Sequence, residues 1–153
     1  MNNAGRRLVL FFATGSGSGY VPVVPGTAGT LVAVVLFFVL SSLSLFLYLL
    51  TTVAFIFISI WIAHQAAILL QMKDPPPVVI DEIAGYLVTM ASFPFTWQYV
   101  AAGFIIFRIF DIIKPFPAGW FDRKVAGGYG IVLDDVAAGI YANIVLQLFR
   151  LMI

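Results

Sequence analysis

The first half of the chain contains 65 consecutive residues, from Leu8 to Met72, without a single Asp, Glu, Lys or Arg. Within this stretch, residues 28–70 are almost entirely apolar, and a helix needs only about 20 such residues to cross a bilayer. Over all 153 residues, 62% are hydrophobic and 10% are charged, whereas soluble domains have roughly 45–50% and about 25%. Because the apolar segments are continuous rather than alternating, the sequence predicts an all-α integral membrane bundle and not a barrel.

Polar and proline-rich breaks divide the chain into segments. Serines at 41, 42 and 44 interrupt the long apolar stretch, and three consecutive prolines at 75–77 require a loop. We predict one domain over residues 1–153, with about four to five membrane-embedded helices, some of them short. The predicted helices are 28–41, 43–72, 81–93, 97–113 and 131–152, with an amphipathic interfacial segment over residues 118–129.

The basic residues orient this arrangement. Cytoplasmic loops of membrane proteins carry an excess of Lys and Arg. If the N-terminus is inside, one side of the membrane receives Arg6, Arg7, Lys73, Lys114, Arg123 and Lys124. The sequence therefore predicts a multi-pass membrane protein whose charged residues face the cytoplasm.

Six of the seven carboxylates fall between Asp81 and Asp135. Two adjacent pairs, Asp81–Glu82 and Asp134–Asp135, each lie near a predicted helix start, and converging carboxylates repel one another unless a cation binds between them. Oxygen ligands without cysteine suit Mg²⁺. Helix capping by each pair is the alternative interpretation.

Arg108, Asp111 and Lys114 are spaced at i, i+3 and i+6, which places them along one face near the end of a predicted helix. Arg and Lys together are suited to binding a phosphate group. The alternative is an intrahelical Arg108–Asp111 salt bridge, which would leave Lys114 free. Further along, Asp122 and Arg123 follow two aromatic residues, as is typical of a segment at the membrane surface.

Several classes of function are excluded by what the sequence lacks. Without cysteine there is no thiolate nucleophile and no cysteine-rich metal site. A net charge of +1 without a basic stripe argues against nucleic acid as a partner. The glycine-rich segment 15–30 lacks the lysine of a nucleotide-binding loop, although its backbone could closely approach a phosphate or an ion.

Five blocks of sequence resemble the phosphatidylglycerophosphatase A family of bacterial magnesium-dependent lipid phosphatases. They are SGYVPVVPGTAGTL (18–31), VIDEIAGY (79–86), FRIFDIIKPFP (107–117), WFDRKVAGGYGIVLDD (120–135) and the following VAAGIYANI. The resemblance implies Mg²⁺-dependent hydrolysis of phosphatidylglycerophosphate to phosphatidylglycerol, a step in phospholipid biosynthesis.

Carried over onto matching positions, the resemblance implies an acidic site and a set of phosphate-binding residues. The acidic site is Asp81, Glu82, Asp111, Asp122, Asp134 and Asp135. The predicted phosphate-binding residues are Arg108, Lys114 and Arg123, and the predicted magnesium ligands are Asp81, Glu82, Asp134 and Asp135.

The attacking group is either a water molecule helped by a carboxylate or the carboxylate of Asp111 or Asp122, which would form an aspartyl phosphate. The alternative function is a cation- or proton-coupled transporter, because acidic residues within membranes also mark ion paths. A transporter site is expected near the middle of helices, whereas these carboxylates lie at predicted helix ends. A non-catalytic membrane scaffold gives no reason for so many carboxylates beside cations. The sequence does not indicate an oligomeric state.

Overall fold

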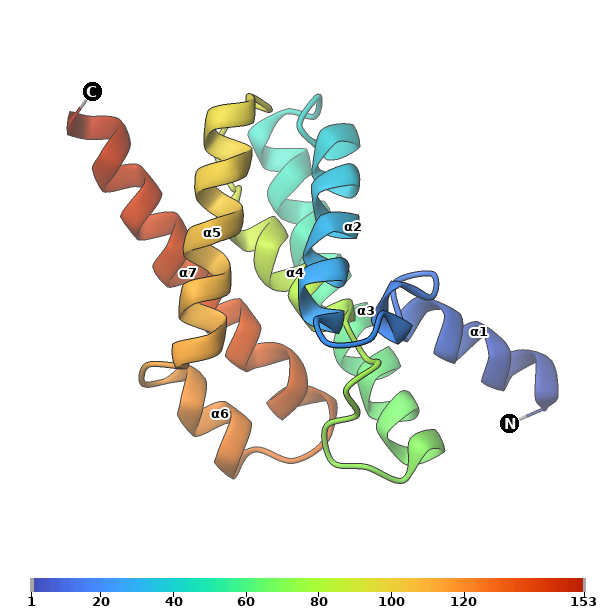
Figure 1. Ribbon diagram of the computed structural model, residues 1–153. Coiled ribbons are helices and arrows are strands. Elements are labelled where there is room, and N and C mark those ends of the chain that lie inside the picture. The colour runs from blue at the N-terminus through green and yellow to red at the C-terminus, as the bar shows by residue number, and fades with distance from the viewer. Residues whose placement is uncertain (1, 153) are drawn as a thin grey trace.

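The computed structural model describes residues 2–152, and the secondary structure of this part of the chain is entirely helical (Figure 1). Its α-helices are α1 (Asn3–Ala13), α2 (Pro25–Leu40), α3 (Leu45–Leu70), α4 (Ile80–Thr89), α5 (Trp97–Ile113), α6 (Ala118–Lys124) and α7 (Gly128–Met152), with a short 3₁₀ helix, η1 (Ser18–Tyr20). The prediction of an all-α fold is confirmed. Residues 1 and 153 of the predicted domain lie outside the described residues.

Local sequence signals explain where the first long helices begin and end. Helix α2 starts at Pro25, three residues before the predicted 28–41 segment, because the fixed backbone angle of proline suits the first helical position. The side chain of Ser44 accepts a hydrogen bond from the amide of Leu47 at 3.4 Å and so caps α3. Helix α3 ends where Gln71 adopts a left-handed conformation, one residue before the end of the predicted 43–72 segment.

Helix α4 is the shortest of the central helices and lies among α2, α3, α5 and α7 (Figure 1). Its ten residues extend over about 15 Å at 1.5 Å per residue, and it ends before the predicted residue 93. Glycines allow α4 to approach α7 closely, since a Cβ atom at Gly85 would lie 2.6 Å from the backbone oxygen of Asp135. The start of α4, which carries two carboxylates, is therefore held directly against α7.

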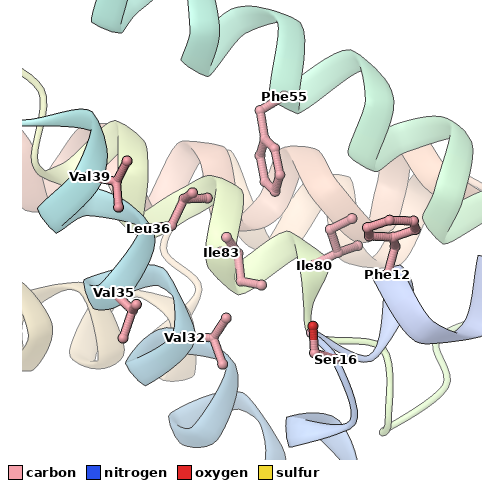
Figure 2. A pocket seen from close by; sticks show the side chains of 10 residues that line it. Phe12, Ser16, Val32, Val35, Leu36, Val39, Phe55, Ile80 and Ile83 are labelled. Carbon is pink, nitrogen blue, oxygen red and sulfur yellow. The ribbon is translucent and has the colours of Figure 1, made fainter. Parts of the chain in front are cut away.

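An apolar groove of about 490 Å³ lies beside α4. Figure 2 shows side chains of α2, among them Val32 and Leu36, facing Phe55 of α3 and Ile83 of α4. The residues that line this groove include no charged side chain. The groove is therefore apolar, unlike the parts of the fold where the charged residues lie.

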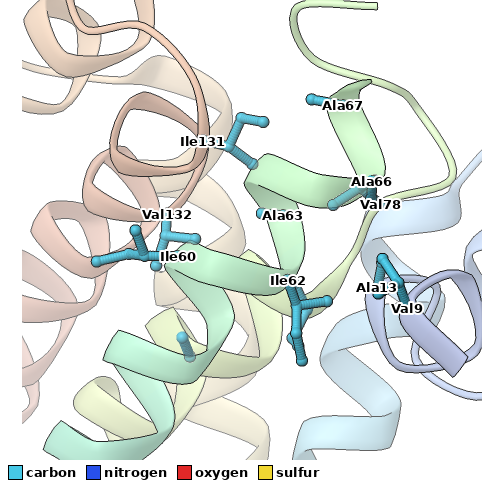
Figure 3. Close-up of a cluster of buried hydrophobic side chains, with 12 residues drawn as sticks. Val9, Ala13, Ile60, Ile62, Ala63, Ala66, Ala67, Val78, Ile131 and Val132 are labelled. Atoms are coloured by element: carbon cyan, nitrogen blue, oxygen red, sulfur yellow. The ribbon is translucent and has the colours of Figure 1, made fainter. Parts of the chain in front are cut away.

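Two clusters of buried side chains hold the helices together. The first joins α1, α3, α4 and α7 around Ile60, Ala63 and Val132 (Figure 3). The second joins α2, α4, α5 and α7 and includes Tyr86 and Phe107, which are fully buried. Both clusters include residues of α4 and α7, so these two helices are fixed relative to the rest of the fold.

The outer surface of the bundle is also apolar. Large side chains such as Phe46, Trp61 and Ile112 are 74%, 57% and 72% exposed. Helices α3 and α7 are long and apolar enough to cross a membrane, judged by length and composition. These features indicate association with a membrane, while the number of membrane-embedded helices stays a prediction.

The helices differ from the predicted segments in two further places, near the N-terminus and before α7. Residues 3–13 form α1, which no predicted helix covered and which the side chain of Asn2 caps by accepting a hydrogen bond from the amide of Gly5 at 2.8 Å. The predicted interfacial segment 118–129 divides into α6 and the start of α7. The division follows Lys124, where the backbone of Val125 turns extended.

Candidate active site

A cleft of about 530 Å³ collects most of the predicted site residues. Its walls are the start of α2, the proline-rich loop before α4, the first turn of α4, the end of α5 and one residue of α7. The charged residues that line it are Asp74, Asp81, Glu82, Arg108, Asp111, Lys114 and Asp135. The fold therefore brings together charged residues that are up to 61 positions apart in the sequence, from Asp74 to Asp135.

Three carboxylates converge at the base of α4. Asp81 and Glu82 lie in the first turn of α4, and each offers an oxygen within 4.8 Å of the other and of Asp135 on α7. Asp81 and Asp135 are only 8% and 3% exposed. One oxygen of each of the three has no hydrogen-bond partner among the described residues. Below, Asp81, Glu82 and Asp135 are called the acidic trio.

The acidic trio fits a divalent cation. Buried carboxylates repel one another and lack water, so free oxygens at this separation are costly unless a positive charge lies between them. Carboxylate oxygens are the ligands that hard cations such as Mg²⁺ prefer, and the chain has no cysteine to favour a softer metal. The donor set and the unpaired oxygens together describe a site that could hold such an ion.

Asp134, the fourth predicted magnesium ligand, is not part of the acidic trio. One of its oxygens lies 2.5 Å from Nζ of Lys114, and the other accepts a hydrogen bond from the amide of Asp135 at 3.0 Å. Successive residues of an α-helix point about 100° apart, so these neighbouring carboxylates face different partners. Asp134 positions Lys114, whereas Asp135 faces the cleft.

Lys114 is not free, in contrast to what the intrahelical-bridge interpretation implied. Besides Asp134, its Nζ contacts Oδ1 of Asp122 on α6 at 3.2 Å. The left-handed backbone of Lys114, with φ of 47°, ends α5. Burial alone lowers the pKa of Lys114, but its hydrogen bond to Asp134 and the surrounding carboxylates raise the pKa above its ordinary value. The ammonium group is therefore charged at neutral pH.

Arg108 and Asp111 form the predicted ion pair on α5. One guanidinium nitrogen of Arg108 also lies 3.8 Å from Oε1 of Glu82, which links α5 to α4. Glycine at position 26 leaves room for this packing, because a Cβ atom there would lie 2.7 Å from the same nitrogen and 2.2 Å from Oε1 of Glu82, and both side chains would have to shift. Arg108 is thus held between two carboxylates beside the first turn of α2.

Besides Asp134, two predicted site residues lie outside the lining of the cleft. Asp122 is half-buried and reaches the cleft only through Lys114. Arg123, a predicted phosphate-binding residue, is exposed on α6 and does not line the cleft. The backbone oxygen of Asp122 accepts a hydrogen bond from Lys73 at 2.8 Å, which connects α6 to the loop before α4.

Three more residues of the cleft were not predicted as individual site residues, although two of them belong to the glycine-rich segment 15–30, whose backbone was expected to be able to approach a phosphate or an ion. Gly26 and Thr27 belong to the first turn of α2, and Asp74 belongs to the proline-rich loop. Asp74 is exposed to solvent, yet partial desolvation by the surrounding protein raises its pKa above the ordinary value, while Lys114 opposes this and the negative charge of Asp122 adds to it. The signal that could have identified Asp74 is a carboxylate directly before three prolines, which fix the loop in an extended path.

Comparison with known proteins agrees with this arrangement. The family model described as "Phosphatidylglycerophosphatase A" matches residues 11–150. The chain belongs to the phosphatidylglycerophosphatase A family. It is 44% identical to phosphatidylglycerophosphatase A of Escherichia coli strain K12 over 129 residues. These aligned residues cover 84% of this chain and 75% of that protein.

Two further relatives broaden the comparison. Phosphatidylglycerophosphatase A of Haemophilus influenzae is 38% identical, covering 87% of this chain and 83% of its own length. A Bacteroides thetaiotaomicron protein with the provisional name phosphatidylinositol-3-phosphatase is 38% identical, covering 94% of each chain. No solved structure matches the chain.

Membership of this family makes the chain an enzyme of the phosphatase class. The predicted resemblance and the predicted enzyme class are both confirmed. The transporter alternative finds no support in the family or in the named relatives.

Proposed function

We propose that this chain removes the terminal phosphate from phosphatidylglycerophosphate and releases phosphatidylglycerol, with Mg²⁺ held by the acidic trio. The family and the names of its relatives support the substrate. The observation that carries the proposal is the single cleft in which three carboxylates with unpaired oxygens face Arg108 and Lys114. Such a cleft offers both a cation site and positive charge for the phosphate of a phosphomonoester.

Asp81, Glu82 and Asp135 would bind the metal, which when bound supplies a positive charge that polarises the phosphoryl group. Arg108 and Lys114 lie at fixed positions because each is paired with carboxylates outside the trio, Arg108 with Asp111 and Lys114 with Asp134. Fixed cations stabilise the negative charge that develops on the phosphoryl oxygens without having to reorient during the reaction.

Water is the proposed attacking group. Of the two carboxylates that could attack instead, Asp122 does not line the cleft, and Asp111 lines it but is paired with Arg108. A water molecule that gives up its proton to a carboxylate of the cleft needs no covalent intermediate. Trapping of the enzyme with hydroxylamine during turnover should therefore yield no modified aspartate, whereas modification of Asp111 would establish an aspartyl phosphate.

The cleft is proposed to open at the cytoplasmic face of the bacterial inner membrane. Lys73 donates to α6, which brings the basic residues of the α3–α4 loop and of α6 to one end of the molecule. Arg150 donates to the backbone oxygen of Ser92 at 3.3 Å, near the turn between α4 and α5. Figure 1 places that turn and α6 at opposite ends of α5. The excess of Lys and Arg at the α6 end supports a cytoplasmic orientation for it.

Phosphate release by the purified protein in detergent tests the function. The wild-type protein should release phosphate from phosphatidylglycerophosphate with added Mg²⁺ and not with a chelator. Asp81→Asn should lose at least a hundredfold in kcat, while Lys124→Gln on the exposed face of α6 should retain full activity. No release from this lipid by the wild-type protein with Mg²⁺ would refute the proposal.

The Bacteroides relative suggests a comparison of substrates. Its provisional name refers to another lipid that carries a phosphate monoester on its headgroup. Phosphatidylinositol 3-phosphate should therefore be assayed beside phosphatidylglycerophosphate at equal concentration. We expect a higher kcat/KM for phosphatidylglycerophosphate, and the reverse order would assign this chain to the other substrate.

A further inference from the structure

The first turn of α2 has backbone donors without partners. Pro25 has no amide hydrogen, and the first amide of α2 with a partner inside the helix is that of Ala28, which donates to the backbone oxygen of Val24 at 3.2 Å. No side chain caps the helix. The amides of Gly26 and Thr27 therefore have no hydrogen-bond partner among the described residues, although both residues line the cleft.

Helix starts of this kind attract anions. The amides at the start of a helix have no carbonyl partner, and the aligned peptide dipoles add a partial positive charge of roughly half a unit. The side chain that normally satisfies these amides is Ser, Thr, Asp or Asn, yet the residue in the capping position is Val24. The start of α2 is left open to a ligand.

The basic side chains of the cleft do not replace these backbone amides as hydrogen-bond donors to an anion. Arg108 is already paired with Asp111, and Lys114 is paired with Asp134 and Asp122. These ion pairs already use part of the hydrogen-bonding capacity of Arg108 and Lys114. The amides of Gly26 and Thr27 are donors in the cleft that have no partner among the described residues.

A second observation, independent of the helix start, indicates a ligand in the same cleft. Asp81 and Asp135 are more than nine-tenths buried, and each has one oxygen that lacks a partner and lines the cleft. A Mg²⁺ ion bound by one oxygen from each of these three carboxylates would keep coordination positions for other oxygen ligands, such as those of a phosphate. The start of α2 adjoins the trio, because a Cβ atom at Gly26 would lie 2.2 Å from Oε1 of Glu82, so its amides could donate to an anion bound at that cation.

The backbone before α2 is strained in a way that agrees with a ligand site. Val23 has φ of 79°, which is unfavourable for a β-branched residue. Strain of this kind is concentrated at sites where a loop must present groups to a ligand. The side chain of Val23 is 94% exposed, so packing of that side chain does not explain the conformation.

We infer that the amides of Gly26 and Thr27 at the start of α2 bind the phosphate group of the substrate, with the hydroxyl of Thr27 as a further donor. This inference rests on the proposed function and assigns a phosphate-binding element that consists of backbone rather than basic side chains. It also gives the glycine-rich segment a role, because only glycine at position 26 leaves room between the helix start and Arg108.

Binding of inorganic phosphate, the product, tests the inference directly. Val24→Asp would place a carboxylate in the capping position, where it accepts hydrogen bonds from these amides and repels an anion. Val24→Asn caps the helix without the charge. Val21→Asp adds the same charge three residues earlier in the loop, at a position that does not line the cleft. Affinity is measured by calorimetry on the full chain in detergent with saturating Mg²⁺.

We expect Val24→Asp to weaken phosphate binding at least tenfold and Val24→Asn at least threefold, while Val21→Asp stays within twofold of the wild type. Both capped variants should unfold at the same temperature as the wild type or higher, because a cap stabilises the helix. Unchanged phosphate affinity in a capped variant that unfolds at or above the wild-type temperature would overturn the inference. Equal weakening by Val21→Asp and Val24→Asp would also overturn it, because the effect would then be one of charge alone.

The lipid assay separates this inference from the proposed function. If the wild-type protein binds phosphate through these amides but does not hydrolyse phosphatidylglycerophosphate, the proposed function fails and the phosphate site stands. If it hydrolyses the lipid and Val24→Asn leaves both phosphate affinity and KM unchanged, the proposed function stands and the phosphate site fails.

Discussion

Replacement of Asp135 by Asn should stabilise the protein when no divalent cation is present. Its carboxylate is 3% exposed, and its oxygens approach those of Asp81 and Glu82 within 4.8 Å. At 4.8 Å and an effective dielectric constant of about 20, two like charges repel by about 3.5 kcal/mol. Asparagine has nearly the same shape, so the substitution removes the charge without leaving a cavity.

The two repulsions that involve Asp135 set an upper limit of about 7 kcal/mol. Local rearrangement and water reduce this value. A gain of only about 2 kcal/mol would raise the unfolding temperature of a chain of this length by about 4–8 °C. This expectation is opposite to the usual result for a buried substitution, which lowers stability.

Thermal unfolding of the purified protein in detergent, with a chelator or with Mg²⁺, measures the effect. In chelator, Asp135→Asn should unfold at a higher temperature than the wild type. With Mg²⁺ at about 100 times its dissociation constant, the wild type should gain about 2.7 kcal/mol and the variant much less. As a control, Asp122→Asn should keep the wild-type response to Mg²⁺, because Asp122 is not part of the acidic trio.

Two results would refute this reasoning. The first is a lower unfolding temperature for Asp135→Asn in chelator, which would mean that the three carboxylates do not repel one another. The second is an equal response of the wild type and the variant to Mg²⁺, which would mean that the ion binds elsewhere.

Three further expectations concern stability. Lys114→Met should lower the free energy of unfolding by about 3 kcal/mol, measured by denaturation of the protein in detergent, because it leaves the buried carboxylate of Asp134 unpaired. Lys124→Met, at an exposed position, should change the free energy of unfolding little. Asp74→Asn should slightly raise the unfolding temperature at pH 7, because partial desolvation raises the pKa of Asp74 and so penalises its charged form. The difference should shrink as the pH falls through the raised pKa and be absent below the ordinary value of 3.8, and an unchanged difference across pH would contradict this. Val23→Gly should raise stability by about 1 kcal/mol, since a left-handed conformation costs valine about 1–2 kcal/mol, and a loss of stability would show that the valine side chain matters.

Much of the helical framework follows from the sequence because its signals are local. Serine at the α2–α3 turn and the three prolines before α4 interrupt apolar segments at the places where the helices end. Helix α1 was not predicted, because its apolar run is short and is followed at once by glycines. The end of α4 was placed too late, because the residues directly after Thr89 are still apolar and no polar residue or proline marks the change from helix to turn there.

The residue types of the site could be predicted, but their partners could not. Two acidic pairs near helix starts are visible in the sequence, whereas the separation of Asp134 from Asp135 depends on how α7 is rotated about its axis. That rotation is set by packing against α4, where Gly85 allows close contact. The open start of α2 could not be recognised either, because an amide without a partner has no signature in the sequence.

The contact between α4 and α7 also affects how the protein is made. Helix α4 is too short to cross a bilayer, and its buried face packs against α7, the last helix among residues 2–152 to leave the ribosome. Asp81 and Glu82 are therefore synthesised before Asp135, and the acidic trio is complete only when all three residues are present. A nascent chain that contains α2, α3 and α4 but not α7 lacks Asp135, so the proposed metal site can be complete only once synthesis has reached α7.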